Sequence, residues 1–510
     1  MHSYSKKEIL LLAGAVILLL PALLLNLHIV PLYGEEPRRA VVAMEMLFRH
    51  NWLVPTVNGE LYYLKPPFFN WILASLYTLT GNNSEFITRI PTIVSLLLLG
   101  MVMYATGKKY VSRSFGALSA LLFMTAAGNL FFNSLLAEID LFYSLVTYAS
   151  LVCLFHFRQQ GKYFQLFLAV YLLGAIGVLT KGAPSLVYTG LSLLVFFLVN
   201  REFKKLFSLW HLAGIFLFLI IIGGYFWAYS GQGDVMHYMK SLSVESGKRF
   251  SGDTLWDYLL QMAWFPVDTL LNLLPATLLL IFAIRKSFFR IIKSNPLLKF
   301  ALLMLVIHFP VYWLPPGGRQ RYIIMLYPFI IQILTYFYLE FLSTERPKLK
   351  FLTKIPRSAI ISLIFLMIIA RIIFDFTVLP VRAGTGKSAN NRKAAQVIHE
   401  ITKDGKLGVF RTTYFPMQCT YYIERERKEI VPRYRQVVPD SYHVVQIILL
   451  KPYAYRKEIG DLMENPLETS CFIDYRDTED LFSGYNYRTI LEIDLQKRPY
   501  LLVTPVHPHP

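Results

Sequence analysis

The sequence is short of charged residues: Asp, Glu, Lys and Arg make up only 16% of its 510 positions. Soluble domains carry about a quarter, so this composition excludes an ordinary soluble globular protein. There are also only three cysteines, Cys153, Cys419 and Cys471. Their spacing matches neither a metal-ligand motif nor a disulfide framework, which leaves open only a single Cys419–Cys471 bridge. Internal repeats and low-complexity segments are absent from the sequence as well.

Long apolar runs are what the sequence has instead. Hydrophobic residues make up 55% of the chain, and the mean hydropathy is +0.44. A helix needs about 20 mostly apolar residues to cross a bilayer. The first run has no small-residue cleavage site and is too long for a signal peptide, so we expect it to be retained. We predict eleven spans, at residues 9–31, 90–107, 115–133, 138–157, 163–180, 183–199, 211–230, 266–284, 298–314, 322–342 and 358–380.

The net charge of +18 is concentrated in every second connection between these spans. Basic residues gather around Lys6–Lys7, Lys108–Arg113, Arg201–Lys205 and Arg285–Lys293. Cytoplasmic loops carry the excess of Lys and Arg, so these loops and the N-terminus are predicted to be cytoplasmic. An odd number of spans then places the C-terminal tail on the other side. The clustering in short loops also argues against a nucleic-acid partner.

The outer side is predicted to hold two long loops and a soluble tail. Amphipathic helices at 37–50 and after Pro66-Pro67 either lie in the membrane interface or cap the bundle. Beyond residue 383 we predict a helix at 394–401 and strands at 407–411, 444–450 and 500–503. The predicted fold is therefore an all-α polytopic membrane bundle of about 11–13 transmembrane helices at 1–380, followed by a small soluble α/β domain at 381–510.

Carboxylates at the outer membrane boundary are candidates for function. Glu35 and Glu36 follow the first span, and either could act as a general base for an acceptor hydroxyl. They could equally cap the helix that starts at Pro37. Asp140 enters the fourth span and has the same two interpretations.

Cations on the outer side need an explanation, because the positive-inside bias disfavours them there. Lys65 stands before two prolines that fix the backbone, so its ammonium either binds a phosphate or reaches lipid headgroups. The other cations on this side are Lys181, Lys248, Arg249, Arg319 and Arg321. One buried anion bound by several of these cations would explain why they are there. Acids and cations together suggest transfer from a lipid-linked phosphate.

The same residues carry a resemblance to a known family. Over about the first 330 residues, the sequence resembles the aminoarabinose (4-amino-4-deoxy-L-arabinose) transferase-like glycosyltransferases of the C-type membrane fold, which are related to protein O-mannosyltransferases. The matching motifs are Glu35-Glu36-Pro37-Arg38, Glu45-Met46, Trp52, Pro55, Asn58-Gly59, Tyr62-Tyr63, Lys65-Pro66-Pro67, Arg89-Ile90-Pro91, Asp140, Leu179-Thr180-Lys181-Gly182, Arg249-Phe250, Arg319 and Tyr322.

The resemblance implies an inverting transfer of a sugar from a polyprenyl-phosphate donor to a lipid, glycan or protein acceptor outside the cytoplasm. It implies three kinds of site residue. Catalytic roles fall on Glu35, Glu36 and Asp140, donor-phosphate binding on Lys65, Arg249, Arg319, Arg321 and Tyr322, and supporting roles on Arg38, Tyr63, Lys181 and Glu245. Whether Glu35 or Asp140 is the base stays open.

Three positions depart from the family pattern. Glu35 stands where the family has an aspartate, Leu64 where it often has an acid, and Ser246 where a histidine is expected. The last two changes remove ligand-type side chains, so we predict neither a divalent metal nor another cofactor.

The resulting prediction is a monomeric, multi-pass enzyme of the bacterial cytoplasmic membrane, surrounded by membrane lipids, with its site and tail facing the periplasm. The alternative is a transporter or flippase of a lipid-linked sugar, which would need charges near the bilayer midplane and internal repeats. We expect the charges to lie near span ends. A scaffold or sensor that works through its tail would need neither Glu35 nor Lys65.

Overall fold

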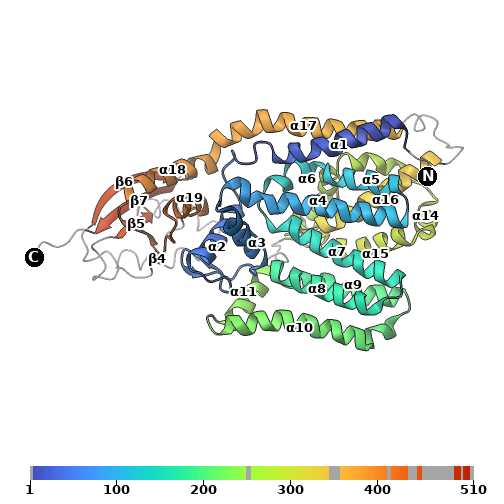
Figure 1. The fold of residues 1–510 in the computed structure, drawn as a ribbon, viewed down its shortest axis with the longest axis horizontal. Helices are drawn as coiled ribbons and strands as arrows, with labels where there is room; N and C mark the ends of the chain where they lie inside the picture. The colour runs from blue at the N-terminus through green and yellow to red at the C-terminus, as the bar shows by residue number, and fades with distance from the viewer. Residues whose placement is uncertain are drawn as a thin grey trace, which may run out of the picture. The chain divides into compact units, whose positions relative to one another are not determined.

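The computed structural model describes residues 4–247, 254–343, 356–410, 415–434, 445–450, 487–495 and 498–505. The chain forms two compact units, each built from segments that are distant in sequence. The first unit is helical, and the second combines helices with a sheet (Figure 1). The first comprises Met1–Leu27, Tyr63–Ile72 and Phe86–Val378, and the second His28–Tyr62, Leu73–Glu85 and Leu379–Pro510.

The first unit is a bundle of helices in which α8 packs against α7, α9 and α10, and α16 packs against α5 and α15. Two of its helices, α4 and α17, have one end in the second unit. The helices are α1 Lys6–Leu24, α4 Glu85–Tyr110, α5 Arg113–Met124, α6 Ala127–Phe131, α7 Ile139–Gln159, α8 Tyr163–Lys181, α9 Ala183–Val199, α10 Leu209–Ser230, α11 Val235–Gly247, α12 Leu255–Asn272, α13 Leu280–Ala283, α14 Phe288–Ser294, α15 Pro296–Trp313, α16 Tyr327–Ser343 and α17 Arg357–Gly384. Short 3-10 turns include η1 Asn133–Leu135, η4 Ala276–Leu279, η5 Gln320–Tyr322 and η6 Ile324–Leu326.

The predicted membrane bundle is confirmed. Within the described residues, eight helices are long and apolar enough to cross a membrane, or up to ten if each of two bent pairs is one span. Helix α9 is apolar but has only 17 residues. Each of the eleven predicted spans falls on one of these helices or bent pairs. In α10 only 11% of the most apolar window is buried by protein, which is typical of a helix that faces lipid.

The predicted span at 266–284 falls on a bent pair of helices. Helix α12 starts at Leu255, and the chain turns by 103° between Asn272 and the next short helical segment. Pro275 lies in this turn. Proline lacks an amide hydrogen and clashes with the preceding turn, which favours a break in a helix.

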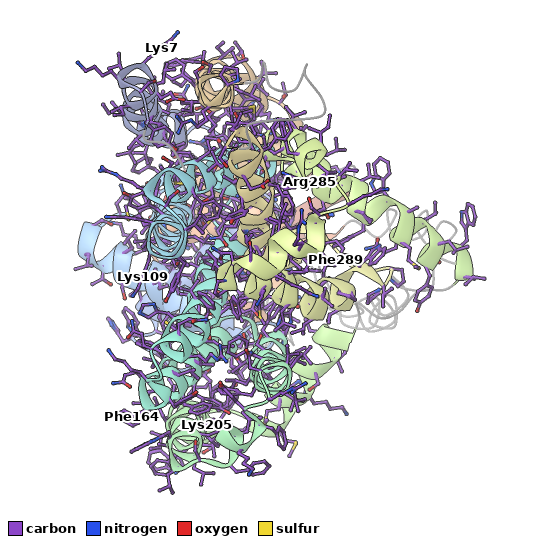
Figure 2. All side chains as sticks on the ribbon, turned by 90° about the vertical axis from the view of Figure 1, so that its right-hand side faces the viewer. Lys7, Lys109, Phe164, Lys205, Arg285 and Phe289 are labelled. Carbon is purple, nitrogen blue, oxygen red and sulfur yellow. The ribbon has the colours of Figure 1, made fainter. Side chains whose placement is uncertain are left out.

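The basic connections share one end of the first unit. Figure 2 views that end and shows Lys7, Lys109, Lys205 and Arg285, which come from four different parts of the sequence. This grouping is what the alternation of basic and non-basic loops predicts. The side of the membrane that this end faces stays a prediction.

The expectation that charges lie only near span ends is wrong for α17. Arg371 and Asp375 lie well inside this helix and are fully buried. Arg371 Nε lies 2.7 Å from Asp375 Oδ1, and the same guanidinium donates to the Leu130 carbonyl and to Ser134. Charges at membrane depth pair with one another or with backbone carbonyls, and this pair does both.

The second unit contains most of the loop between the first two spans, together with the tail. The loop forms α2 Glu36–Phe48, most of α3 Phe68–Thr80, and a hairpin of β1 Thr56–Val57 and β2 Glu60–Leu61. The tail forms α18 Gly386–Thr402, α19 Met417–Arg427 and a sheet of strand order β4-β3-β5-β7-β6. Strand β3 is parallel to β4 and β5, and β7 is antiparallel to β5 and β6. The strands are β3 Lys406–Phe410, β4 Arg433–Tyr434, β5 Val445–Leu450, β6 Tyr487–Leu495 and β7 Arg498–Pro505.

The two predicted helices of the first loop and the α/β tail are thus confirmed, while α19, β4 and β6 were not predicted. That they lie on the outer side of the membrane stays a prediction. Cys471 of the possible disulfide lies outside the described residues. The thiol of Cys419 is buried, 3.3 Å from the carbonyl oxygen of Asn391.

The loop and the tail are joined by backbone hydrogen bonds at the hairpin turn. Asn58 and Gly59 have φ values of 53° and 74°, as a two-residue turn of type I′ requires. Asn58 donates from its side chain to the carbonyl of Val431 at 2.9 Å, and its own carbonyl accepts from the amide of Arg433 at 2.9 Å. Helix α2 packs on α19 beside this turn.

Two glutamates face each other where α2 packs on α19. Glu45 and Glu424 are both fully buried. Glu45 accepts from the Gly59 amide at 3.1 Å, and Glu424 from the Val431 amide at 3.0 Å. Burial raises the pKa of both carboxyls, and the charge of Glu45 raises that of Glu424 further. The raised pKa favours the protonated form of Glu424.

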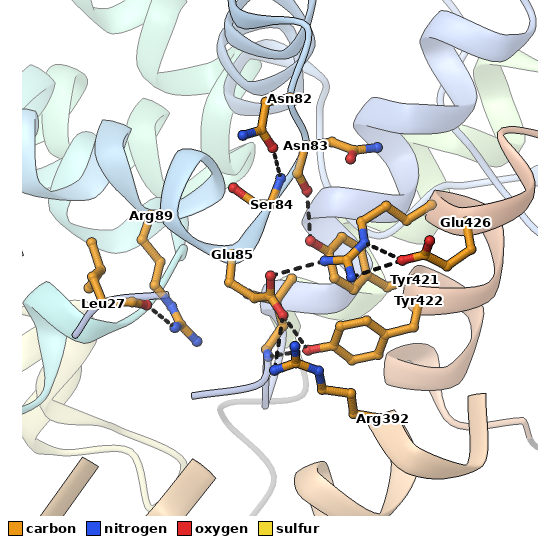
Figure 3. Close-up of polar contacts among 12 residues, drawn as sticks. Leu27, Asn82, Asn83, Ser84, Glu85, Arg89, Arg392, Tyr421, Tyr422 and Glu426 are labelled. Atoms are coloured by element: carbon orange, nitrogen blue, oxygen red, sulfur yellow. Dashed lines mark hydrogen bonds and ion pairs between the residues drawn. The ribbon is translucent and has the colours of Figure 1, made fainter. Parts of the chain in front are cut away.

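Glu85 binds three side chains of the tail. Tyr422 donates to its carboxylate at 2.9 Å and Arg425 at 3.0 Å, while Arg392 lies 3.7 Å away (Figure 3). Its side chain is only 5% exposed. Because a buried carboxylate loses its hydration, these donors replace the water. In the first unit, the buried Arg89 donates to the carbonyl of Leu27 at 2.7 Å (Figure 3).

We expect the stability of the protein to fall with rising pH because the pKa values of Glu45 and Glu424 are raised in the fold. A carboxyl whose folded pKa is raised stabilises the fold below its unfolded pKa and loses that contribution as pH rises. Thermal unfolding between about pH 5 and 8 should therefore show a falling midpoint that Glu424→Gln flattens, since the amide does not ionise. An identical slope in wild type and variant would contradict the raised pKa of Glu424.

We expect Glu85→Ala to lower the free energy of unfolding by about 1–3 kcal/mol, because it leaves the buried donors of Tyr422 and Arg425 unsatisfied. Glu426→Ala is the matched control. Glu426 also pairs with Arg425, at 3.1 Å, but its side chain is 48% exposed, so its loss should change little. The measurement is the thermal unfolding midpoint of each variant in detergent. Equal shifts of the midpoint in the two variants would contradict the role of Glu85.

Candidate active site at the ends of the helices

The candidate site begins where two consecutive helices end. Helices α7 and α8 are joined by a tight turn and pack against each other, so the first turn of α7 lies beside the last turn of α8. Asp140 is in the first turn of α7, and Lys181 is the last residue of α8. A carboxylate at a helix N-terminus and a cation at a C-terminus are both favoured by the helix dipoles. Gly182, at φ 78°, ends α8.

Asp140 and Lys181 form a buried ion pair. Lys181 Nζ lies 2.5 Å from Asp140 Oδ1, and the two side chains are 3% and 9% exposed, respectively. The ammonium also lies 4.7 Å from the ring centre of Tyr143 and 5.2 Å from that of Tyr322. Ring faces attract cations at such distances. Lys181 is therefore held by one carboxylate and two aromatic rings.

A second ion pair, between Glu138 and Arg321, adjoins the first. Arg321 Nη1 lies 2.8 Å from Glu138 Oε2. Burial lowers the pKa of Arg321, but the charges of Asp140 and Glu138 more than offset this and raise it above its usual value. Glu138 was not among the predicted site residues. Its position two residues before Asp140, at the same helix end, is the signal that could have found it.

The short turn η5 that carries Arg321 is fixed by its neighbour Gln320. The side chain of Gln320 donates to the carbonyl of Phe265 at 2.9 Å and accepts from Thr269 and Tyr327, each at 3.0 Å. These three hydrogen bonds fix the backbone at Arg321, although η5 is only a short turn between two helices. Tyr322 follows in the same turn and faces Lys181.

Three of the four charged side chains in the two ion pairs, those of Glu138, Asp140 and Arg321, line one small hollow. Its other lining residues are Phe132, Asn133, Leu136 and Leu141. The hollow thus brings two carboxylates and a guanidinium together beside apolar side chains.

The segment that carries Lys65 packs on α7, the helix that carries Asp140. Phe68 and Phe69, which follow Lys65, have ring centres 5.8 and 6.0 Å from that of Phe142 on α7. Lys65 Nζ lies 3.9 Å from Glu245 Oε1, and the Lys65 carbonyl accepts from Tyr238 at 3.0 Å. The hydroxyl of Tyr238 thus helps to fix the backbone of the lysine.

Tyr63 and Glu245, both predicted as supporting residues, lie beside these contacts. The Tyr63 ring packs edge-on against His237 at 4.6 Å and Tyr238 at 5.5 Å. The structure therefore brings Tyr63, Lys65 and Glu245 together from the loop between the first two spans and from α11.

The Glu35 group lies in the second unit. Glu35 Oε2 lies 2.6 Å from Arg38 Nη1 and 3.7 Å from Arg39 Nη2, and its side chain is 36% exposed. Glu36 is fully buried, and its carboxylate accepts from the amide of Tyr33 at 3.0 Å. Glu36 thus makes the local contact expected of a helix N-terminus, whereas Glu35 is accessible.

The remaining predicted cations differ in their surroundings. Arg319 is exposed at the start of η5. Lys248 and Arg249 lie outside the described residues. In the part of the chain that the structure describes, no group of three or more His, Cys, Asp or Glu side chains could hold a metal ion.

We expect Lys181→Met to lower the free energy of unfolding by about 3–5 kcal/mol, because it leaves the buried carboxylate of Asp140 without its partner. The double variant Asp140→Asn with Lys181→Met removes both charges and should recover most of the thermal midpoint. Equal midpoints in the single and double variants would contradict a buried, charged pair.

Comparison with known proteins supports the resemblance drawn from the motifs. Residues 64–227 match the family described as dolichyl-phosphate-mannose-protein mannosyltransferase. Over 177 residues the chain is 30% identical to undecaprenyl phosphate-alpha-4-amino-4-deoxy-L-arabinose arabinosyl transferase 1 of Proteus mirabilis, covering 34% of this chain and 32% of that protein. Over 331 residues it is 27% identical to the arabinosyl transferase of Pseudomonas savastanoi pv. phaseolicola, covering 64% and 60%.

These alignments span from about a third to about three fifths of the relatives' own length. The structural likeness extends further. The crystal structure of ArnT from Cupriavidus metallidurans bound to undecaprenyl phosphate matches with a TM-score of 0.66 and 14% identity, over 97% of both chains. At that identity the likeness establishes the fold, and a fold alone does not establish a function. The chain is thus a multi-pass membrane protein with the fold of ArnT, and its sequence resembles the aminoarabinose transferases.

Proposed function

We propose that the protein is an inverting glycosyltransferase that moves a sugar from a polyprenyl-phosphate donor to an acceptor on the periplasmic side of the bacterial cytoplasmic membrane. The observation that carries this proposal is the pair of adjoining ion pairs at the helix ends, Asp140 with Lys181 and Glu138 with Arg321. Asp140, Glu138 and Arg321 line one hollow there. The segment of Lys65 packs on the same helix. A lipid-linked donor explains why cations gather at the boundary of an apolar bundle.

The leaving group is a polyprenyl phosphate. Lys65 and Arg321, with Lys181 behind them, stabilise the charge that develops on its phosphate as the bond to the sugar breaks. Such electrostatic stabilisation is usually the largest single contribution to catalysis. Arg319, Arg249 and Tyr322 are the further donor-phosphate residues of this proposal.

The acceptor oxygen attacks the anomeric carbon from the side opposite to the phosphate, so the configuration inverts. Its proton passes to a carboxylate, for which we propose Glu35, with Arg38 as its positioning partner at 2.6 Å. The Asp140 side chain is only 9% exposed, whereas that of Glu35 is 36% exposed, which favours Glu35 over Asp140 as the proton acceptor. The buried Glu36 is bound to the Tyr33 amide and is less suited to this role.

The names of the relatives suggest the donor to try first, which is undecaprenyl-phosphate-linked aminoarabinose. Lipid A is the first acceptor to test, before other glycans and proteins. In this proposal residues 1–380 form the transmembrane transferase part and 381–510 an outer soluble domain, and the protein works as a monomer without a metal cofactor.

We expect Lys65→Ala to lower the rate of transfer by about 100-fold, because it removes one charge that stabilises the leaving phosphate. The measurement is the release of undecaprenyl phosphate from the aminoarabinose donor by purified protein in liposomes that contain lipid A. Wild-type turnover in the variant would contradict the role of Lys65.

Lys109→Ala is the matched control for this variant. Lys109 is an exposed lysine at the basic end of the first unit (Figure 2), and its removal should leave the rate unchanged. Equal expression and equal thermal midpoints of both variants separate a loss of activity from a loss of folding.

A further inference from the structure

Glu138 is a charged residue of the hollow to which the proposed reaction gives no role. It precedes α7 as the N-cap residue, yet its side chain makes no capping hydrogen bond there. Instead it binds Arg321 at 2.8 Å, and only 14% of the Glu138 side chain is exposed. The negative charge of this carboxylate repels any anion that approaches Arg321.

The charges of the two ion pairs cancel. Glu138 and Asp140 contribute two negative charges, and Arg321 and Lys181 contribute two positive ones. A site built only to hold phosphate would be expected to carry an excess of cations. In these two pairs each cation has a carboxylate of its own, and both carboxylates line the hollow.

The substrate and the product of the proposed reaction differ in charge. The phosphate of a sugar-linked donor is a diester with one negative charge. After transfer it is a monoester, whose charge near pH 7 is about −1.5 to −2. A strongly cationic site would therefore bind the spent lipid more tightly than the fresh donor and would be inhibited by its product.

We propose that Glu138 is a positioning residue that holds Arg321 and keeps the cluster of two ion pairs electrically neutral, so that the spent polyprenyl phosphate is released. This inference rests on the proposed function. A guanidinium has five N–H groups, so Arg321 can bind an anion in the hollow while its Nη1 stays on Glu138. The carboxylate then repels the second negative charge of the product.

Glu138→Gln tests this directly, because the amide oxygen can still accept from Arg321 while the negative charge is gone. Binding of undecaprenyl phosphate to the purified full chain in detergent is compared with binding of undecaprenol, the same chain without phosphate. We expect the dissociation constant for undecaprenyl phosphate to fall about tenfold, with undecaprenol unchanged. Product inhibition of transfer should strengthen to the same extent.

Glu202→Gln is the matched control. Glu202 pairs with Arg158 at 2.9 Å, also half-buried, and Arg158 lies at the opposite end of α7. Its neutralisation should leave binding of both lipids unchanged. A gain in the Glu202 variant as large as in the Glu138 variant would overturn the inference.

Two further variants complete a double-mutant cycle, namely Arg321→Gln and the double variant Arg321→Gln with Glu138→Gln. They keep the test decisive if the single Glu138 variant does not fold. Arg321→Gln leaves Glu138 without its cation, so this variant should bind undecaprenyl phosphate more weakly than the wild type. The double variant should bind it more tightly than Arg321→Gln. If Glu138 served only to orient Arg321, removing its charge would weaken binding or leave it unchanged, and the inference would fail. If the wild-type chain did not prefer undecaprenyl phosphate to undecaprenol, the proposed function itself would fail.

Discussion

The structure depends on one constraint: a charge inside an apolar bundle has to be matched by a partner. Taking an ion out of water costs several kcal/mol even after relaxation. Asp140, Lys181, Arg371 and Asp375 are all buried, and each is held in an ion pair. The same constraint acts in the second unit, where Glu85 accepts from Tyr422 and Arg425 and where burial raises the pKa of Glu45 and Glu424. Buried charge is thus either paired or disfavoured in both units.

Pairing also explains how a bundle of helices produces a site. Because α7 and α8 are antiparallel neighbours, the positive end of one dipole lies beside the negative end of the other. Each end favours one sign of charge, so Asp140 and Lys181 meet there. Arg321 and Glu138 extend the cluster from an adjacent turn. The chemistry therefore lies at the ends of the spans, while the buried pair of α17 binds protein groups on η1 and α6.

Much of this could be predicted from the sequence because membrane spans are set by local composition. The eleven apolar runs, the alternation of basic loops and the helix around 37–50 all follow from short stretches of sequence. The bend after Asn272 was missed, although Pro275 marks it. Strand β4 was missed because it has only two residues and its partner β3 lies in another segment of the tail. Strand β6 was missed although it pairs with its sequence neighbour β7.

The partners of the site residues were harder to predict than the residues themselves. Lys65, Lys181 and Arg321 were found because cations are unexpected on the outer side. Their carboxylates, Glu245, Asp140 and Glu138, come from other segments of the chain, and no local pattern specifies these pairs. The sequence also gave no sign that the charges of the two ion pairs cancel, since that depends on which side chains meet.

The central claim is that the protein transfers a sugar from a lipid-linked donor. The most direct test is mass spectrometry of the lipid and glycan fractions of cells with and without the gene. The account predicts that one fraction loses a single mass of sugar size, which would identify the acceptor and the transferred group together. If no fraction changes while polyprenyl-phosphate sugar accumulates in the inner leaflet, the protein is a flippase and the account is wrong.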